Sequence, residues 1–229
     1  MRFKSTRALV ALVAVLAMSA VTAAAASAVK PEFKPVPAKK AFLVSAGTSK
    51  WVFGANSISC TSATAAGEIV NAQSVGNVVV KYSGCKSSGT TESNCPVNST
   101  GAKAGQIVTL PLSGELGTVA TSQAASGVGL SFKPENSSQE WFKTEGNKCT
   151  IGVAWLGGLA AEVSVIGKKQ TTNGLVLKPA SSFGTTGEKI KEITLDSGVF
   201  EEPVFEEYGT KASIETTDDW QFAEAVEVT

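Results

Sequence analysis

Hydrophobic and polar residues alternate in short runs along most of the chain after residue 40. Residues 75–84, 149–155 and 159–165 each place apolar side chains at every second position. This period of two is typical of strands that bury one face. Glycine interrupts the runs about every 8–12 residues, as it does in sandwiches and barrels. The pattern predicts an all-β protein, a single antiparallel β-sandwich or β-barrel-like domain with two disulfides.

Two local features sharpen this prediction. Gly157-Gly158 separates two of the alternating runs, which predicts a hairpin at that point. Trp155 shares the parity of the buried positions, so we expect it in the core. Residues 212–228 are less clear, because most of their large apolar residues follow strand parity while Phe222 and Val226 also fit one helical turn.

Residues 1–28 follow a different pattern. Three basic residues precede an apolar run of 11 residues, and small residues then lead to Ala26-Ser27-Ala28. This order predicts a secretory signal peptide that is cleaved after Ala28. The alternative is an uncleaved anchor, but a membrane-spanning helix needs roughly 20 apolar residues. We therefore expect the protein to be secreted and extracellular, with no membrane association after cleavage.

Residues 29–40 contain three prolines and four lysines and predict an extended linker. The β domain is expected to occupy residues 41–229. Its charge is uneven: residues 29–191 hold 16 basic and 9 acidic side chains, whereas residues 192–229 hold 1 basic and 11 acidic ones. The acidic segment is also rich in large apolar residues, so we expect it to be folded rather than to form a solvated tail.

The four cysteines are Cys60, Cys85, Cys95 and Cys149. In an exported chain this number predicts two disulfides. Zinc and redox sites are disfavoured, because the chain has no histidine and no C-x-x-C motif. Three connectivities are possible. We favour Cys85–Cys95, which closes a local loop between two strand-like runs, and Cys60–Cys149, which ties an early strand to a late one.

The absence of histidine excludes Ser-His-Asp and Cys-His catalysis. No cofactor or metal site is expected, and basic residues are not interleaved with aromatic ones as in nucleic-acid-binding proteins. Carboxylate chemistry remains open. Glu68 in "GEI" and Glu115 in "GEL" are a candidate pair for glycoside hydrolysis, which needs carboxyl groups about 5 or 6.5–9.5 Å apart. The alternative is two solvated strand carboxylates.

Trp51 in "SKWVFG" and Trp141 in "SSQEWFK" stand among polar neighbours. They are the candidate ligand-binding residues, since an exposed indole could stack on a sugar ring. The alternative is that both pack in the core, as large aromatic residues usually do.

Several segments together resemble a group of exported actinobacterial proteins of unknown function. The resemblance runs from about residue 59 to the C-terminus and is most specific over residues 75–117. The segments that carry it are Cys60, "GEI", "SVGNVVVKYSGCKSSG", Cys95, "GAKAGQIVTLPLSGELG", "GVGLSFKP", Cys149, "EVSVIGK" and "ASIETTDDWQFAEAVEV". The polar loop between Cys85 and Cys95 is longer here than in that group. The resemblance implies secretion and one intact domain, and it implies no activity.

Three functions follow as hypotheses. The first is a secreted non-catalytic β-domain protein that binds a cell-surface or environmental polymer, such as a cell-wall polysaccharide. The second is a carboxylate-dependent glycoside hydrolase built on Glu68 and Glu115. The third is a structural or inhibitory protein-interaction module that acts through the loop Lys86–Asn94.

Overall fold

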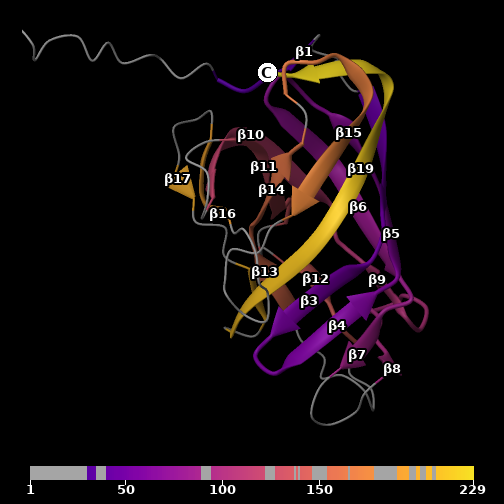
Figure 1. The fold of residues 1–229 in the computed structure, drawn as a ribbon. Coiled ribbons are helices and arrows are strands. Elements are labelled where there is room, and N and C mark those ends of the chain that lie inside the picture. Colours follow the sequence, from indigo (N-terminus) through magenta and orange to yellow (C-terminus); the bar gives the residue numbers. More distant parts are fainter. Residues whose placement is uncertain are drawn as a thin grey trace, which may run out of the picture.

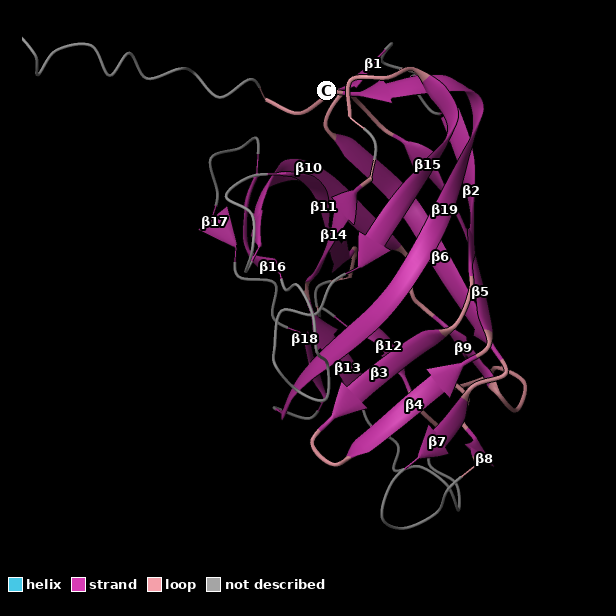
Figure 2. Cartoon of the chain, viewed as in Figure 1, coloured by secondary structure: helices cyan, strands magenta, loops and turns pink. Residues whose placement is uncertain are grey.

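The computed structural model describes residues 30–34, 40–88, 94–121, 127–136, 138, 140–145, 154–164, 166–177, 190–195, 200–201, 205–207 and 210–229. Over these residues the regular elements are all strands (Figure 2). No helix in this part of the chain has the length and apolarity needed to cross a membrane. The predicted signal peptide, residues 1–28, lies outside the described residues.

The strands have the following bounds: β1 (Phe33–Lys34), β2 (Lys40–Ala46), β3 (Ser49–Phe53), β4 (Asn56–Cys60), β5 (Ser62–Ile69), β6 (Ser74–Ser83), β7 (Lys86–Ser88), β8 (Cys95–Pro96), β9 (Gln106–Val108), β10 (Leu112–Thr121), β11 (Gly127–Pro134), β12 (Glu140–Lys143), β13 (Ala154–Gly157), β14 (Leu159–Val163), β15 (Gln170–Leu177), β16 (Ile190–Leu195), β17 (Phe200–Glu201), β18 (Phe205–Glu207) and β19 (Thr210–Val228). The described pairings are antiparallel, so the predicted all-β antiparallel class is confirmed.

Most of the described strands belong to two sheets. In the first, which we call the main sheet, the pairing order is β2–β5–β6–β10–β11–β14–β15–β19, and β19 pairs in turn with β2. In the second, the end sheet, the order is β12–β13–β18–β19–β3–β4–β7–β8. The long strand β19 belongs to both and runs most of the length of the molecule (Figure 1).

Side chains that point inward from alternate positions of the strands fill the interior of the main sheet. On β5, Ala63, Ala65 and Ile69 are buried while Ser62 and Thr64 are exposed. The small inward residues of β5 leave room for large aromatic ones from neighbouring strands. The rings of Phe42 and Trp220 stack there, with centroids 4.2 Å apart. Offset aromatic packing of this kind stabilises a core beyond the apolar area that it buries.

The acidic C-terminal segment is part of this core. Residues 210–228 form the single strand β19, which settles the ambiguous pattern in favour of a strand. Ile214, Trp220, Phe222, Val226 and Val228 are all buried. The expectation of a folded segment is confirmed, since these side chains face the interior while charged neighbours such as Asp219 are exposed.

The described part of the predicted linker is not a free segment. Phe33 is only 1% exposed, and β1 pairs with the end of β19 through Phe33 and Val228. The backbone NH of Phe33 also donates to the carbonyl oxygen of Ala72 at 2.7 Å. Although this segment is rich in proline and lysine, Phe33 at the right register anchors residues 30–34 to the sheet.

The predicted hairpin at Gly157-Gly158 is wrong. Strand β13, before the glycines, pairs with β12 and β18 of the end sheet. Strand β14, after them, pairs with β11 and β15 of the main sheet. Gly157 has a φ of 100°, which a residue with a side chain rarely adopts. At the two glycines the chain therefore passes from the end sheet to the main sheet and does not turn between paired strands.

Candidate functional site

Three neighbouring segments cross from the main sheet to the end sheet at one place. Strand β2 passes to β3 through Gly47-Thr48, β4 passes to β5 through Thr61, and β6 passes to β7 through Gly84-Cys85. Strands β2, β5 and β6 are neighbours in the main sheet, and β3, β4 and β7 are neighbours in the end sheet. The three crossings therefore lie side by side, and together they form what we call the corner (Figure 1).

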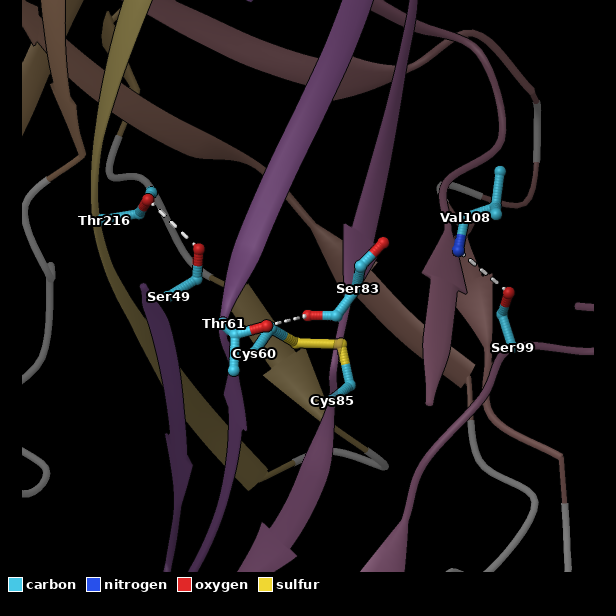
Figure 3. The surroundings of a disulfide bond; sticks show 8 residues. All are labelled: Ser49, Cys60, Thr61, Ser83, Cys85, Ser99, Val108 and Thr216. Carbon is cyan, nitrogen blue, oxygen red and sulfur yellow. Dashed lines mark hydrogen bonds between the residues drawn. A yellow bond between two sulfur atoms is a disulfide. The ribbon is translucent and has the colours of Figure 1, made fainter. Parts of the chain in front are cut away.

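Hydrogen bonds fix the corner (Figure 3). The backbone NH and the hydroxyl of Thr61 both donate to the carbonyl oxygen of Ser83, at 2.9 and 3.2 Å. The buried Ser49 hydroxyl donates to Thr216 Oγ1 at 3.1 Å, which joins β3 to β19. Gly84 has a φ of 65°, and a Cβ at this position would clash with the hydroxyl of Thr61. Glycine is thus required here both for its backbone angle and for the close approach of Thr61.

A disulfide also joins the strands of the corner, between Cys60 and Cys85 (Figure 3). Both predicted pairs, Cys85–Cys95 and Cys60–Cys149, are therefore wrong. The cause is the register of β5 and β6, in which Ser62 lies opposite Ser83. Cys60 and Cys85 each lie two residues outside that pair, so hairpin pairing brings them together. Spacing along the sequence carried no information on this register.

The bridge between Cys60 and Cys85 leaves two further cysteines in the sequence, Cys95 and Cys149. Cys95 is disulfide-bonded, and there is no free cysteine among the described residues. Cys149 lies outside the described residues. With Cys60 and Cys85 joined, Cys149 is the one cysteine of the sequence that remains for Cys95. The pairing of Cys95 with Cys149 is therefore our prediction for the second bridge.

A depression of about 840 Å³ lies over the corner. Its described lining residues are Gly47, Thr48, Ser49, Lys50, Ser59, Cys60, Thr61, Gly84, Lys86, Ser87, Ser88, Asn94 and Thr216. Seven of these 13 residues are serine or threonine, and two are lysine. No acidic or aromatic side chain occurs among them. The depression is therefore a wide, hydroxyl-rich surface with positive charge.

The two lysines share one row of the end sheet. Lys50 of β3 lies opposite Ser59 of β4, and Ser59 lies opposite Lys86 of β7. Side chains in one row across a sheet point to the same face, and here all three are exposed. Neighbouring strands are about 4.8 Å apart, so the backbones of the two lysines are about 10 Å apart. Among the described residues, neither lysine forms an ion pair.

This arrangement supplies hydrogen bonds and positive charge. Hydroxyl groups donate and accept, while each ammonium group only donates. The described part of the chain contains no group of three or more His, Cys, Asp and Glu residues that could hold a metal ion. The described lining residues include no carboxylate or imidazole that could act as a general base on one of the hydroxyls. The hydroxyl and ammonium groups can hold a ligand through hydrogen bonds and charge.

The structure does not place Trp51 or Trp141 at a surface. Trp51 is fully buried, and its ring packs edge-on against Tyr82 and Trp155 at centroid distances of 5.0 and 5.2 Å. Trp141 is 2% exposed and donates from Nε1 to the carbonyl oxygen of Gly157 at 2.8 Å. The candidate sugar-stacking platform is therefore corrected: neither indole offers a face to a ligand.

Glu68 and Glu115 lie on the two strands that flank β6, opposite Gly76 and Ser74 respectively. Asn77 Nδ2 donates to Glu68 Oε1 at 2.6 Å. Glu115 instead lines a small hollow of about 140 Å³ with Ser74, Ser113, Gly114, Ser131, Lys133 and Leu195. Glu68 is not among the described residues of that hollow, so the structure does not bring the two carboxylates into it together.

The loop Lys86–Asn94 is described only at its ends, since residues 89–93 lie outside the described residues. Both ends line the depression, through Lys86, Ser87, Ser88 and Asn94. The sequence therefore pointed to one wall of the depression, because it suggested this loop as a surface for contacts with another protein. It did not indicate Thr48, Ser59 or Thr61, because isolated hydroxyl residues in strands carry no motif and only the strand pairing assembles them.

Comparison of the chain with protein-family models, with curated proteins and with solved structures found no match.

Proposed function

We propose that this chain is a secreted, non-catalytic protein that binds a cell-surface or environmental polymer in the depression over the corner. The observation that carries the proposal is the depression itself, which five exposed or partly exposed hydroxyl side chains line: Thr48, Ser59, Thr61, Ser87 and Ser88. A polymer with many hydroxyl groups offers the matching donors and acceptors along its length. Export rests on the signal-peptide pattern of residues 1–28, and a structural disulfide is compatible with it.

The rigidity of the corner supports binding. Side chains that are already held in place lose little freedom when a ligand arrives, which improves affinity. Thr61 is held by its bond to the Ser83 carbonyl oxygen, and the buried Ser49 below it is held by its hydrogen bond to Thr216. The disulfide lies directly beneath these groups and is buried, with Cys85 fully inaccessible. The polar surface is therefore supported by covalent and hydrogen-bonded contacts from below.

A binding assay with two matched tryptophan variants tests this proposal. Ser59→Trp places a large ring in the middle of the depression, whereas Thr64→Trp places the same ring on the exposed face of β5, outside the described lining residues. The purified secreted protein is incubated with insoluble cell-wall polysaccharide, and the bound fraction is measured. We expect the wild type and Thr64→Trp to bind alike and Ser59→Trp to bind at least about tenfold more weakly.

The proposal would be wrong if the wild type bound none of a broad panel of surface polymers. It would also be wrong if Ser59→Trp bound as well as the wild type, because a ligand in the depression must meet that side chain. Circular dichroism of both variants shows whether each keeps the strand signal of the wild type, which separates a blocked site from an unfolded protein.

A further inference from the structure

We infer that the polymer is an anionic glycopolymer and that Lys50 and Lys86 are the residues that select it. This inference rests on the proposed function and specifies its ligand class. Three observations carry it: the burial of the tryptophans, the row of two lysines around Ser59, and the absence of arginine after residue 7 of the sequence.

The first step is that the described lining of the depression offers no aromatic surface on which a sugar ring could stack. A neutral polysaccharide offers hydroxyl groups and the apolar faces of its rings. Trp51 and Trp141 are buried, and no aromatic side chain occurs among the described lining residues. Only hydrogen bonds would then hold a neutral chain, and each one replaces a hydrogen bond to water with little net gain. Charge is the remaining source of selectivity at this surface.

The second step is the position of the charge. Lys50 and Lys86 flank Ser59 in one exposed row, so the depression presents ammonium, hydroxyl and ammonium groups in sequence. No acidic side chain occurs among the described lining residues to neutralise them. Hydrogen bonds between charged and neutral partners are stronger than those between neutral groups. Two anionic groups on one polymer strand could therefore each meet a lysine, with a sugar hydroxyl facing Ser59.

The third step separates a glycopolymer from a nucleic acid. Proteins that bind single strands stack bases on aromatic side chains, and those that read phosphates closely often use arginine. The chain has arginine only at positions 2 and 7, within the predicted signal peptide. The described lining of the depression has no aromatic residue. Point charges on lysine with many hydroxyl groups suit a polymer of acidic sugars or sugar-like alcohol phosphates.

Carboxylate and phosphate groups share the chemistry that a lysine recognises, so the probes must distinguish them. The carboxylate probe is polygalacturonic acid, and its methyl ester is the matched neutral polymer. The phosphate probe is a poly(glycerol phosphate). Single-stranded DNA is included as an anionic polymer with stacking bases. Binding of each probe to the full secreted protein is measured by calorimetry at low and at high salt.

The variants are Lys50→Gln, Lys86→Gln and the double variant, with Lys81→Gln as the control. Lys81 is an exposed lysine of β6 that is not among the described lining residues. Exposed ion pairs are weak, so each single change at the depression is expected to reduce affinity for the acidic probe about two- to fivefold.

We expect at least one acidic polymer to bind about tenfold more tightly than the methyl ester at low salt, and this advantage to shrink at high salt. The double variant should lose most of that advantage, and Lys81→Gln should keep it. Equal binding of acid and ester by the wild type would overturn the inference while leaving the proposed function in place. If the double variant bound the acidic polymer as tightly as the wild type does, the inference would likewise be overturned and the proposed function would stand.

DNA that binds as tightly as the acidic polymer would overturn the choice of a glycopolymer. If the wild type bound neither these probes nor cell-wall polysaccharide, the proposed function itself would fail. The phosphate and carboxylate probes decide only which anion is preferred, and tight salt-dependent binding of either one supports the inference.

Discussion

Strands β3, β4 and β7 carry two faces of opposite character within a single layer. The inner row contains Trp51 and Ile58, both fully buried or nearly so. The outer row, displaced by one residue on each strand, contains Lys50, Ser59 and Lys86, which are all exposed. A shift of one residue moves a side chain to the other face of a sheet. The two faces therefore share one backbone, and the inner face fixes the position of the outer one.

The inner face is a cluster of aromatic rings, whereas the described outer face has none. Trp51 lies 5.0 Å from the ring centroids of Tyr82 and Phe142, and the rings of Phe142 and Trp155 stack at 5.5 Å. Aromatic pairs of this geometry contribute about 0.5–1.5 kcal/mol each beyond the area they bury. We conclude that the aromatic residues of this end of the molecule stabilise the sheet, and that the residues of the proposed ligand contact lie on its other side.

The largest expected effect comes from breaking the inner face. Trp51→Ala should destabilise the protein by about 3–5 kcal/mol, because it leaves a large cavity among packed rings. Its neighbour Lys50 is exposed on the other face, and Lys50→Gln should change stability by less than about 0.5 kcal/mol. Urea unfolding followed by tryptophan fluorescence measures both. If Trp51→Ala kept full stability and lost only polymer binding, Trp51 would be a ligand contact and the distinction between the faces would fail.

The second effect concerns the disulfide that joins β4 to the segment after β6. Cys60 and Cys85 are 25 residues apart in sequence. Closing a loop of this length is worth about 3.5 kcal/mol in the chain-entropy model, so the double change Cys60→Ala and Cys85→Ala should lose roughly that much stability. Peptide mapping without reduction should recover Cys60 with Cys85, and Cys95 with Cys149. Recovery of Cys60 with Cys95 or with Cys149 would contradict the structure.

The alternation of residues predicted the strands well because it depends on local geometry. The run predicted over residues 75–84 overlaps β6 (Ser74–Ser83), and the predicted core residue Trp155 is fully buried. Alternation gives the parity of a strand and not its partner, which is why the hairpin at Gly157-Gly158 was predicted wrongly. The disulfide pairs failed for the same reason, since Cys60 and Cys85 meet only through the register of β5 with β6.

The candidate site failed on a different point. Trp51 was chosen because its sequence neighbours are polar, yet in a strand the adjacent residues point to the opposite face. The polarity of Lys50 therefore gives no information on the exposure of Trp51. The same alternation that predicted the strand favours a buried indole at this position. The depression could not be predicted from the sequence, because Thr48, Thr61 and Gly84 come together only where three separate crossings line up.

The smallest expected effects come from adding one methyl group at each of two glycines. One of them, Gly67, faces the core, and the other, Gly47, lines the depression. A Cβ at Gly67 would lie 2.6 Å from Phe42 Cζ and 2.8 Å from Val78 Cγ2. Phe42 cannot easily retreat, because Trp220 stacks on it. Gly67→Ala should therefore cost about 1–3 kcal/mol. A Cβ at Gly47, in the depression, would have no atom within 4 Å, so Gly47→Ala should be neutral or stabilise by up to about 1 kcal/mol. Equal losses in thermal unfolding would show that the corner is packed as tightly as the core, and would leave no open depression for a ligand.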